Sequence, residues 1–152
     1  MANTLEELIH QSSPITNPKQ RALVNFIYTN SVIQGKLKLH FNRFGITPQQ
    51  YNVLRILRGA SKPVSIQDIR QRMLDQNSDA SRLVERLAVK KMASKFVCPA
   101  DKRLVDISIT SLGLDLLTEI ESSNTPFYDV FFAKLDTPEL DFFNAILDKL
   151  RE

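Results

Sequence analysis

Between positions 77 and 86 the sequence gathers side chains whose hydrogen-bonding groups have defined directions. An asparagine, two serines, an aspartate and two arginines fall within these ten positions. Arginine can pair in a bidentate manner with the major-groove edge of guanine, asparagine with adenine, and aspartate can accept from the cytosine amine. The chemistry indicated is therefore recognition of base edges in duplex DNA. The candidate contacts are Asn77, Ser78, Asp79, Ser81, Arg82 and Arg86.

Two interpretations stay open for the aspartate of this segment. Asp79 could accept a hydrogen bond from a base, but an acid is also favoured in the first turn of a helix by the helix dipole. Arg82, three positions later, is interpreted as a base contact.

Charge is unevenly distributed along the chain. The 152 residues carry a net charge of +3, but the segment from Thr47 to Thr110 holds twelve Lys and Arg against six Asp and Glu. This segment is therefore at +6 and the two flanks together are at −3. A basic centre between acidic flanks favours a polyanionic partner, although basic residues that only solvate exposed helix faces would give the same count.

A second polar cluster lies in a predicted β-hairpin. Strands are predicted around Phe96 and over 105–109, where apolar and polar residues alternate, with a turn at 99–102 between them. Lys102 and Arg103 fall at or near the tip, where they could reach phosphates or a minor groove. Asp101 beside them is interpreted as a brace that pairs with a basic side chain. The alternative is an exposed hairpin with solubilising charge.

The elements that would position these clusters follow from caps and hydrophobic periodicity. Helices are predicted to begin at Thr4, at Pro18, at Pro48 after the capping box Thr47–Gln50, at Ser65, and at Asn77. The second runs to about residue 44, the fourth lasts about two turns, and the fifth ends near residue 92. After the hairpin, a long helix capped by Thr110 with a bend near Pro126 precedes a last helix over 138–150.

Three helices followed by a hairpin are the order of a winged helix-turn-helix. The predicted fold is mainly α with a small β-hairpin, and helix 77–92 is the recognition helix. The predicted division is 1–46 for N-terminal dimerisation helices, 47–110 for the DNA-binding region and 111–152 for C-terminal dimerisation helices.

Four fragments in order resemble the MarR family of bacterial regulators: Thr47–Leu54, Ser81–Leu87, Asp101–Arg103 and Ile109–Gly113. The resemblance covers about 65 central residues. It implies a dimer that binds a pseudo-palindromic operator, and in many members a small, often phenolic, ligand releases the DNA. By position, Ser78, Ser81, Arg82 and Arg86 match the recognition helix, Asp101 and Arg103 match a wing pair, and Lys95 falls where the family usually has an arginine.

Two positions depart from the family pattern. Lys91 stands where the family often has glycine, so the end of the recognition helix is open to change. Cys98 lies in the wing, whereas the redox-sensing members keep their reactive cysteine in the first long helix, and we interpret Cys98 as a bystander.

A ligand site is predicted between the first long helix and the recognition helix. Its ligand would be apolar or aromatic, and the candidate lining residues are Phe26, Tyr28, Phe44 and Tyr51. Packing alone explains these four aromatic residues equally well.

The sequence lacks the residues that several classes of protein function require. There are two histidines, His10 and His40, and one cysteine, and the sequence has no HExxH, CxxC, GxSxG or glycine-rich phosphate loop. We therefore expect no enzyme, metal site or cofactor. With no apolar run of about 20 residues and no signal peptide, a cytoplasmic protein is expected.

The predicted function is a homodimeric DNA-binding transcriptional regulator, a repressor in the first instance with an activator as the open alternative. The rival function is a winged-helix module that binds another protein and no DNA, because the aromatic-rich ends of the chain suit either association.

Overall fold

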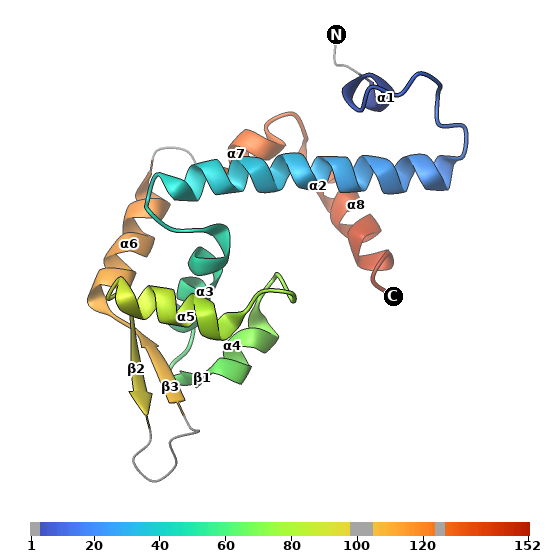
Figure 1. The fold of residues 1–152 in the computed structure, drawn as a ribbon. Coiled ribbons are helices and arrows are strands. Elements are labelled where there is room, and N and C mark those ends of the chain that lie inside the picture. Colours follow the sequence, from blue (N-terminus) through green and yellow to red (C-terminus); the bar gives the residue numbers. More distant parts are fainter. Residues whose placement is uncertain (1–3, 98–104, 124–126) are drawn as a thin grey trace. The chain divides into compact units, whose positions relative to one another are not determined.

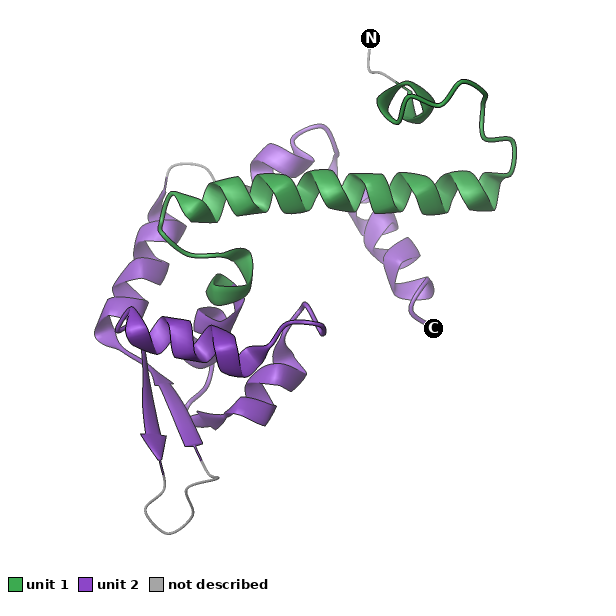
Figure 2. Ribbon diagram, in the orientation of Figure 1, with its two compact units in different colours: residues 1–51 green, residues 52–152 purple. Residues whose placement is uncertain are grey.

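The structure is a computed structural model that describes residues 4–97, 105–123 and 127–152, with the backbone alone at residue 127. The chain divides into two compact units, residues 1–51 and residues 52–152 (Figure 2). The boundary between them falls inside a helix, α3 (Pro48–Arg58). The functional division predicted at residues 46 and 110 stays a prediction.

The first unit holds two helices, α1 (Leu5–Leu8) and α2 (Pro18–Asn42), and the start of α3 (Figure 1). Local caps fix where these helices begin. Thr4 and Glu7 form a capping box, and the Asn17 side chain accepts from the first turn of α2, where Pro18 is the first residue. These predicted starts are confirmed.

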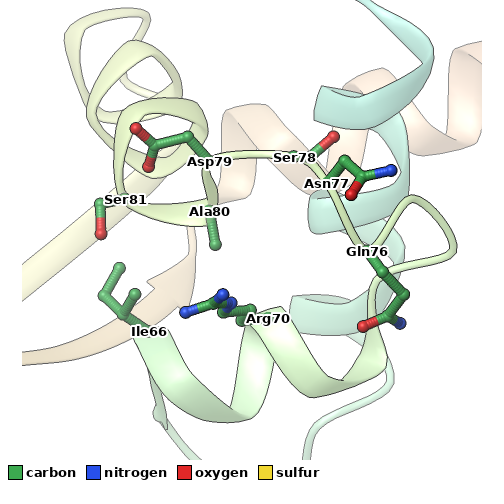
Figure 3. Close-up of a pocket in the computed structure, with 8 residues that line it drawn as sticks. All are labelled: Ile66, Arg70, Gln76, Asn77, Ser78, Asp79, Ala80 and Ser81. Atoms are coloured by element: carbon green, nitrogen blue, oxygen red, sulfur yellow. The ribbon is translucent and has the colours of Figure 1, made fainter.

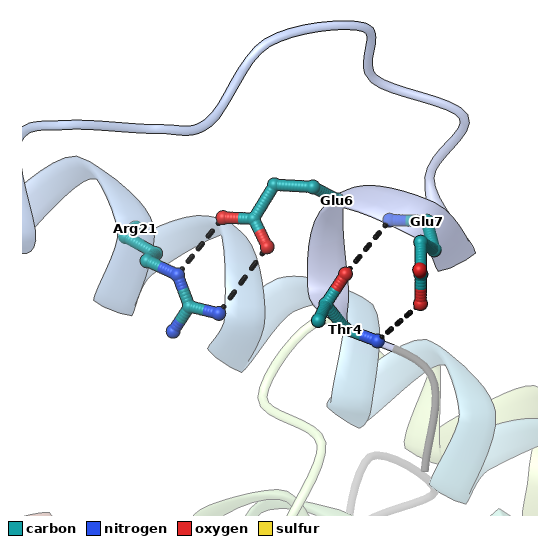
Figure 4. A network of polar contacts seen from close by, with 4 residues as sticks. All are labelled: Thr4, Glu6, Glu7 and Arg21. Atoms are coloured by element: carbon teal, nitrogen blue, oxygen red, sulfur yellow. Dashed lines mark hydrogen bonds and ion pairs between the residues drawn. The ribbon is translucent and has the colours of Figure 1, made fainter. Parts of the chain in front are cut away.

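An ion pair joins the two helices of this unit (Figure 4). The Arg21 guanidinium donates to both carboxylate oxygens of Glu6, at 2.9 and 3.3 Å. Because the guanidinium bonds the charged form of Glu6, the pKa of this carboxyl is below its ordinary value.

Much of the apolar stripe of α2 is exposed in the structure. Among the residues of α2, Phe41 is buried. Leu23, Phe26 and Ile27 keep more than half of their surface exposed. An amphipathic helix normally buries such a stripe against another apolar surface.

The second unit contains a winged-helix arrangement. After α3 come β1 (Val64–Ser65), α4 (Ile66–Arg72), α5 (Ala80–Val89), β2 (Ala93–Val97) and β3 (Val105–Ile109). The three strands form an antiparallel sheet in the order β1-β3-β2. The core of this region consists of fully buried apolar side chains, namely Val53, Leu54, Ile69, Val84, Leu87 and Ile107.

The hairpin predicted from alternation is confirmed, and the sheet has one strand more than predicted. Val64 and Ser65 pair with Ile107 and Asp106. A two-residue strand is too short to give an alternating pattern, which is why the sequence does not reveal it.

The helix predicted to be the recognition helix, α5, is shorter than predicted. It begins at Ala80 and ends at Val89, whereas the sequence predicted Asn77 to about Met92. Asn77 and Ser78 lie in the preceding turn because Asp75 bonds both of them: its carboxylate accepts from the Asn77 N–H at 3.0 Å and from the Ser78 hydroxyl at 2.8 Å. This Asx-type turn competes with helix formation.

The C-terminal part also differs from its prediction. Where one long helix with a bend was predicted, the structure has α6 (Ser111–Ser122) and α7 (Phe127–Phe132), followed by α8 (Thr137–Lys149). Thr110 is the N-cap of α6, as predicted, and Asp136 is the N-cap of α8. Pro126 lies outside the described residues. Among the described residues no helix has both the length and the apolar character to cross a membrane.

Candidate nucleic-acid interface

One face of α5 is exposed and carries polar and basic side chains. Ala80, Val84 and Leu87 point into the core, and the exposed positions follow at helical spacing: Ser81, Arg82, Glu85, Arg86 and Val89. Three of the residues predicted to contact DNA are therefore together on one face, namely Ser81, Arg82 and Arg86. In the part of the chain that the structure describes, neither arginine has an ion pair or a side-chain hydrogen bond.

Asp79 is the N-cap of α5. Its Oδ1 accepts from the backbone N–H of Arg82 at 3.1 Å. A capping side chain satisfies one of the four N–H groups that a helix N-terminus leaves without a partner. Asp79 therefore has a structural role as a helix cap, and base contact by its carboxylate stays a prediction.

The turn before α5 is held from two sides. The Ser78 hydroxyl donates to the Asp75 carboxylate. The oxygen lone pairs of Ser78 can therefore still accept a hydrogen bond. From α3, the Asn52 side chain accepts from the backbone N–H of Leu74 at 2.9 Å. Sequence reasoning missed Asn52, because its partner lies 22 positions away and neither residue shows a local signal.

The acid on the exposed face of α5 is paired with the wing. Lys95 on β2 donates from its Nζ to Glu85 at 2.5 Å. Lys95 was predicted to contact DNA; the structure places its ammonium at Glu85, where it compensates the one acid among the exposed residues of α5. The DNA contact by Lys95 stays a prediction.

The C-terminal end of α5 is closed by a Schellman motif. The backbone N–H of Met92 bonds the carbonyl of Leu87 at 2.9 Å, and that of Lys91 bonds the carbonyl of Ala88 at 2.9 Å. Lys91 occupies the left-handed position of this motif, at φ 59°. The departure from glycine noted in the sequence therefore leaves the helix end intact, with a lysine in a conformation that favours glycine.

The same helix end is bonded to the start of α6. Thr110 donates from its backbone N–H to the Met92 carbonyl at 3.1 Å and from its hydroxyl to the Lys91 carbonyl at 2.7 Å. Thr110 also caps α6 by accepting from the Gly113 N–H at 3.2 Å. The Thr110 side chain thus joins the turn that follows α5 to the first turn of α6.

The four predicted ligand-site residues do not form one cluster. Tyr51 stacks on Phe41 with ring centroids 4.4 Å apart, and Phe44 contacts His40 edge to face at 5.5 Å. Phe26 and Tyr28 lie earlier on α2, and 13 residues of helix from Tyr28 to Phe41 span about 20 Å at 1.5 Å per residue. The ligand site stays a prediction.

Part of the predicted interface lies outside the described residues. This holds for Asp101, Lys102 and Arg103 at the hairpin tip, and for Cys98. Across the described ranges no group of three or more His, Cys, Asp or Glu side chains is placed to hold a metal ion.

Comparison with solved structures relates this arrangement to known proteins. A putative MarR-like transcription regulator from Bacillus cereus has a TM-score of 0.75 with 18% identity, over 89% of this chain and 97% of that one. A mutant E. coli MarR in complex with operator DNA has a TM-score of 0.72 with 18% identity, over 98% and 99%. The S. aureus MepR–DNA complex has a TM-score of 0.70 with 23% identity, over 82% and 92%.

At these identities the likeness establishes the fold. The chain has the winged-helix fold of MarR-family transcriptional regulators, as the sequence fragments indicated. No family model matches the sequence, and no curated protein matches it.

Proposed function

We propose that this protein is a DNA-binding transcriptional regulator of the MarR type and that α5 is its recognition helix. The observation that carries the proposal is the exposed face of α5, where Arg82 and Arg86 stand one turn apart without an acidic partner among the described residues and Glu85 is paired with Lys95. Two free guanidinium groups on a helix are suited to guanine edges and phosphates in the major groove.

Two structural neighbours were solved with DNA, which supports DNA as the partner. Two copies would place their recognition helices about 34 Å apart, one turn of DNA, and would bind a pseudo-palindromic operator. The uncovered apolar residues of α2 support such a homodimer, which would work in the cytoplasm as a repressor. Release by a small aromatic ligand would require that the ligand bind better to a dimer with another helix spacing.

The first test is binding to duplex DNA as a function of salt. Affinity should fall steeply as salt rises, because lysine and arginine contacts release counterions from the phosphates. A module that binds only proteins would show no affinity for duplex DNA even at low ionic strength. That result would overturn the proposal.

The second test concerns base recognition by α5. Operator fragments selected from random duplexes provide the specific site, and Arg82→Ala should reduce discrimination at one base position by about 1–3 kcal/mol. Lys38→Ala on α2 is the matched control, since it removes one exposed positive charge in the other unit. If Arg82→Ala kept the full operator preference, the assignment of α5 would be wrong.

A further inference from the structure

A cavity of about 440 Å³ lies between α4 and the start of α5 (Figure 3). Its lining comes from α4, from the turn and from the first residues of α5: Ile66, Arg70, Gln76, Asn77, Ser78, Asp79, Ala80 and Ser81. Arg70 is the one cationic residue in this lining. Figure 3 shows its guanidinium extending from α4 into the space below Ala80, with the Asp79 carboxylate turned away from it.

Arg70 has no ion pair and no hydrogen bond from its side chain to any residue that the structure describes, and it is exposed. Arg72, on the same helix, has different electrostatic surroundings. The carboxylate of Asp68 is held by Ser65 in the capping box of α4, and the positive charge of Arg72 contributes to lowering the pKa of Asp68. Two exposed arginines two residues apart thus differ in whether an acid interacts with them.

The place of the cavity in the fold suggests what Arg70 meets. In a helix-turn-helix the recognition helix puts its N-terminal residues into the major groove, and the preceding helix crosses the sugar-phosphate backbone. A space between these two helices, at the N-terminal end of α5, therefore faces the backbone at the edge of the groove. Guanidinium groups bind phosphate in a bidentate manner, and serine hydroxyls are common second donors.

We propose that this cavity binds one backbone phosphate of the DNA, held by the guanidinium of Arg70 with the Ser81 hydroxyl as second donor. The inference rests on the proposed function, since it requires that α5 enter the major groove. It adds a residue outside the recognition helix that supplies affinity for any sequence. Its role differs from that of Arg82, which supplies preference.

The experiment compares variants on two duplexes, a selected operator and an unrelated sequence, over a range of salt concentrations. Arg70→Gln should weaken binding to both duplexes by the same factor, about tenfold, and should lower the slope of log affinity against log salt by about 0.9. Arg72→Gln is the matched control, with one positive charge removed from the same helix, and should leave the slope unchanged. Ser81→Ala should weaken both duplexes by a smaller, equal factor.

A fourth substitution separates charge from geometry. Arg70→Lys keeps the charge and should keep the salt slope, while it loses part of the affinity because an ammonium cannot form the bidentate pair. The urea midpoint of every variant should match that of the unchanged protein, because Arg70, Arg72 and Ser81 are all exposed. Arg70→Lys also keeps the proposal testable if Arg70→Gln fails to fold.

Two outcomes would overturn the inference and leave the proposed function intact. In the first, Arg70→Gln and Arg72→Gln have the same affinity and the same slope. In the second, Arg70→Gln weakens the operator alone, which would make Arg70 a base contact. Absence of duplex binding by the unchanged protein would instead overturn the proposed function, and this inference with it.

Discussion

Asp79 Oδ1 accepts a hydrogen bond from the Arg82 backbone N–H, and this bond caps the start of α5. Replacing an aspartate N-cap with alanine costs about 0.5–2 kcal/mol, whereas asparagine caps about as well as aspartate. Asp79→Ala should therefore lower the free energy of unfolding by about 1 kcal/mol, and Asp79→Asn should leave it nearly unchanged. Urea unfolding followed by circular dichroism measures both.

The same pair of variants tests the base contact predicted for Asp79. The two variants share the loss of the carboxylate but differ in the cap. A change in base preference in both, at one operator position, would show that the carboxylate contacts a base. Equal stability of Asp79→Ala and the unchanged protein would contradict the capping role.

A second carboxylate, Glu121, carries a pH-dependent contribution to stability. Arg58 donates two hydrogen bonds to it, at 2.9 and 2.6 Å, and these bonds are the main cause that holds the pKa of Glu121 below its ordinary value. Because the folded-state pKa is the lower one, the contribution is present above the ordinary pKa of glutamate. It is lost as pH falls through the lowered value.

An NMR titration of the glutamate side chains should show this shift directly. Arg58→Gln should return the pKa of Glu121 toward its ordinary value, because it removes both hydrogen bonds. Arg55→Gln is the control, since Arg55 acts on Glu121 only through its charge, and its effect should be smaller. A Glu121 pKa that Arg58→Gln does not raise would show that the pair does not form in solution.

At the scale of elements, the sequence predicts well the helix starts that are fixed by hydrogen bonds between residues close in sequence. The capping boxes at Thr4, Thr47 and Ser65 each join residues three positions apart, so the pattern and the structure agree. The start of α5 was predicted three residues early because Asn77, Ser78 and Asp79 are all capable N-caps. The side chain that decides among them is Asp75, and it acts by bonding the turn.

The junction of α5 and α6 was not predictable from local pattern. A Cβ at Gly113 would lie 2.4 Å from the Met92 carbonyl oxygen and 2.8 Å from Ile109 Cγ1. Glycine is required because the backbone that follows α5, at Met92, and the first turn of α6 come this close. The sequence shows a glycine inside a predicted helix and does not show what it touches.

Gly113→Ala should therefore destabilise the protein by about 1–3 kcal/mol through overpacking. Gly35→Ala is the matched control, because Gly35 is also helical and a Cβ there would meet nothing within 4 Å. At that site alanine should stabilise by about 0.5–1 kcal/mol, the difference in helix propensity. Thermal and urea unfolding would measure both, and a neutral Gly113→Ala would contradict the close approach of α6 to the Met92 backbone.

At the scale of the whole molecule, hydrophobic periodicity predicts that a face is covered but not what covers it. The apolar pattern of α2 predicts a core face, yet Leu23, Phe26 and Ile27 are exposed in the single chain. The last helix also has exposed apolar residues, since Phe142 and Leu150 are each about 70% exposed. Monomeric proteins rarely leave such apolar surface uncovered, and subunit interfaces of obligate dimers resemble a core cut in half.

The homodimer predicted from these faces can be tested with two charge substitutions. Phe142→Glu places a charge on α8, where the side chain is 69% exposed, and Leu74→Glu does so at the turn before α5, where it is 88% exposed. Neither change should disturb the fold of the single chain, because both side chains are already in solvent. Only the first falls on a face that the second copy would cover.

Sedimentation velocity at several concentrations should give twice the mass of the 17.4 kDa chain for the unchanged protein and for Leu74→Glu. Phe142→Glu should shift the equilibrium toward the single chain, because a charge buried without a partner in an interface is costly. It should also weaken operator binding, since a single recognition helix cannot contact two half-sites at once. A dimer of Phe142→Glu as stable as that of Leu74→Glu would place the interface elsewhere on the molecule.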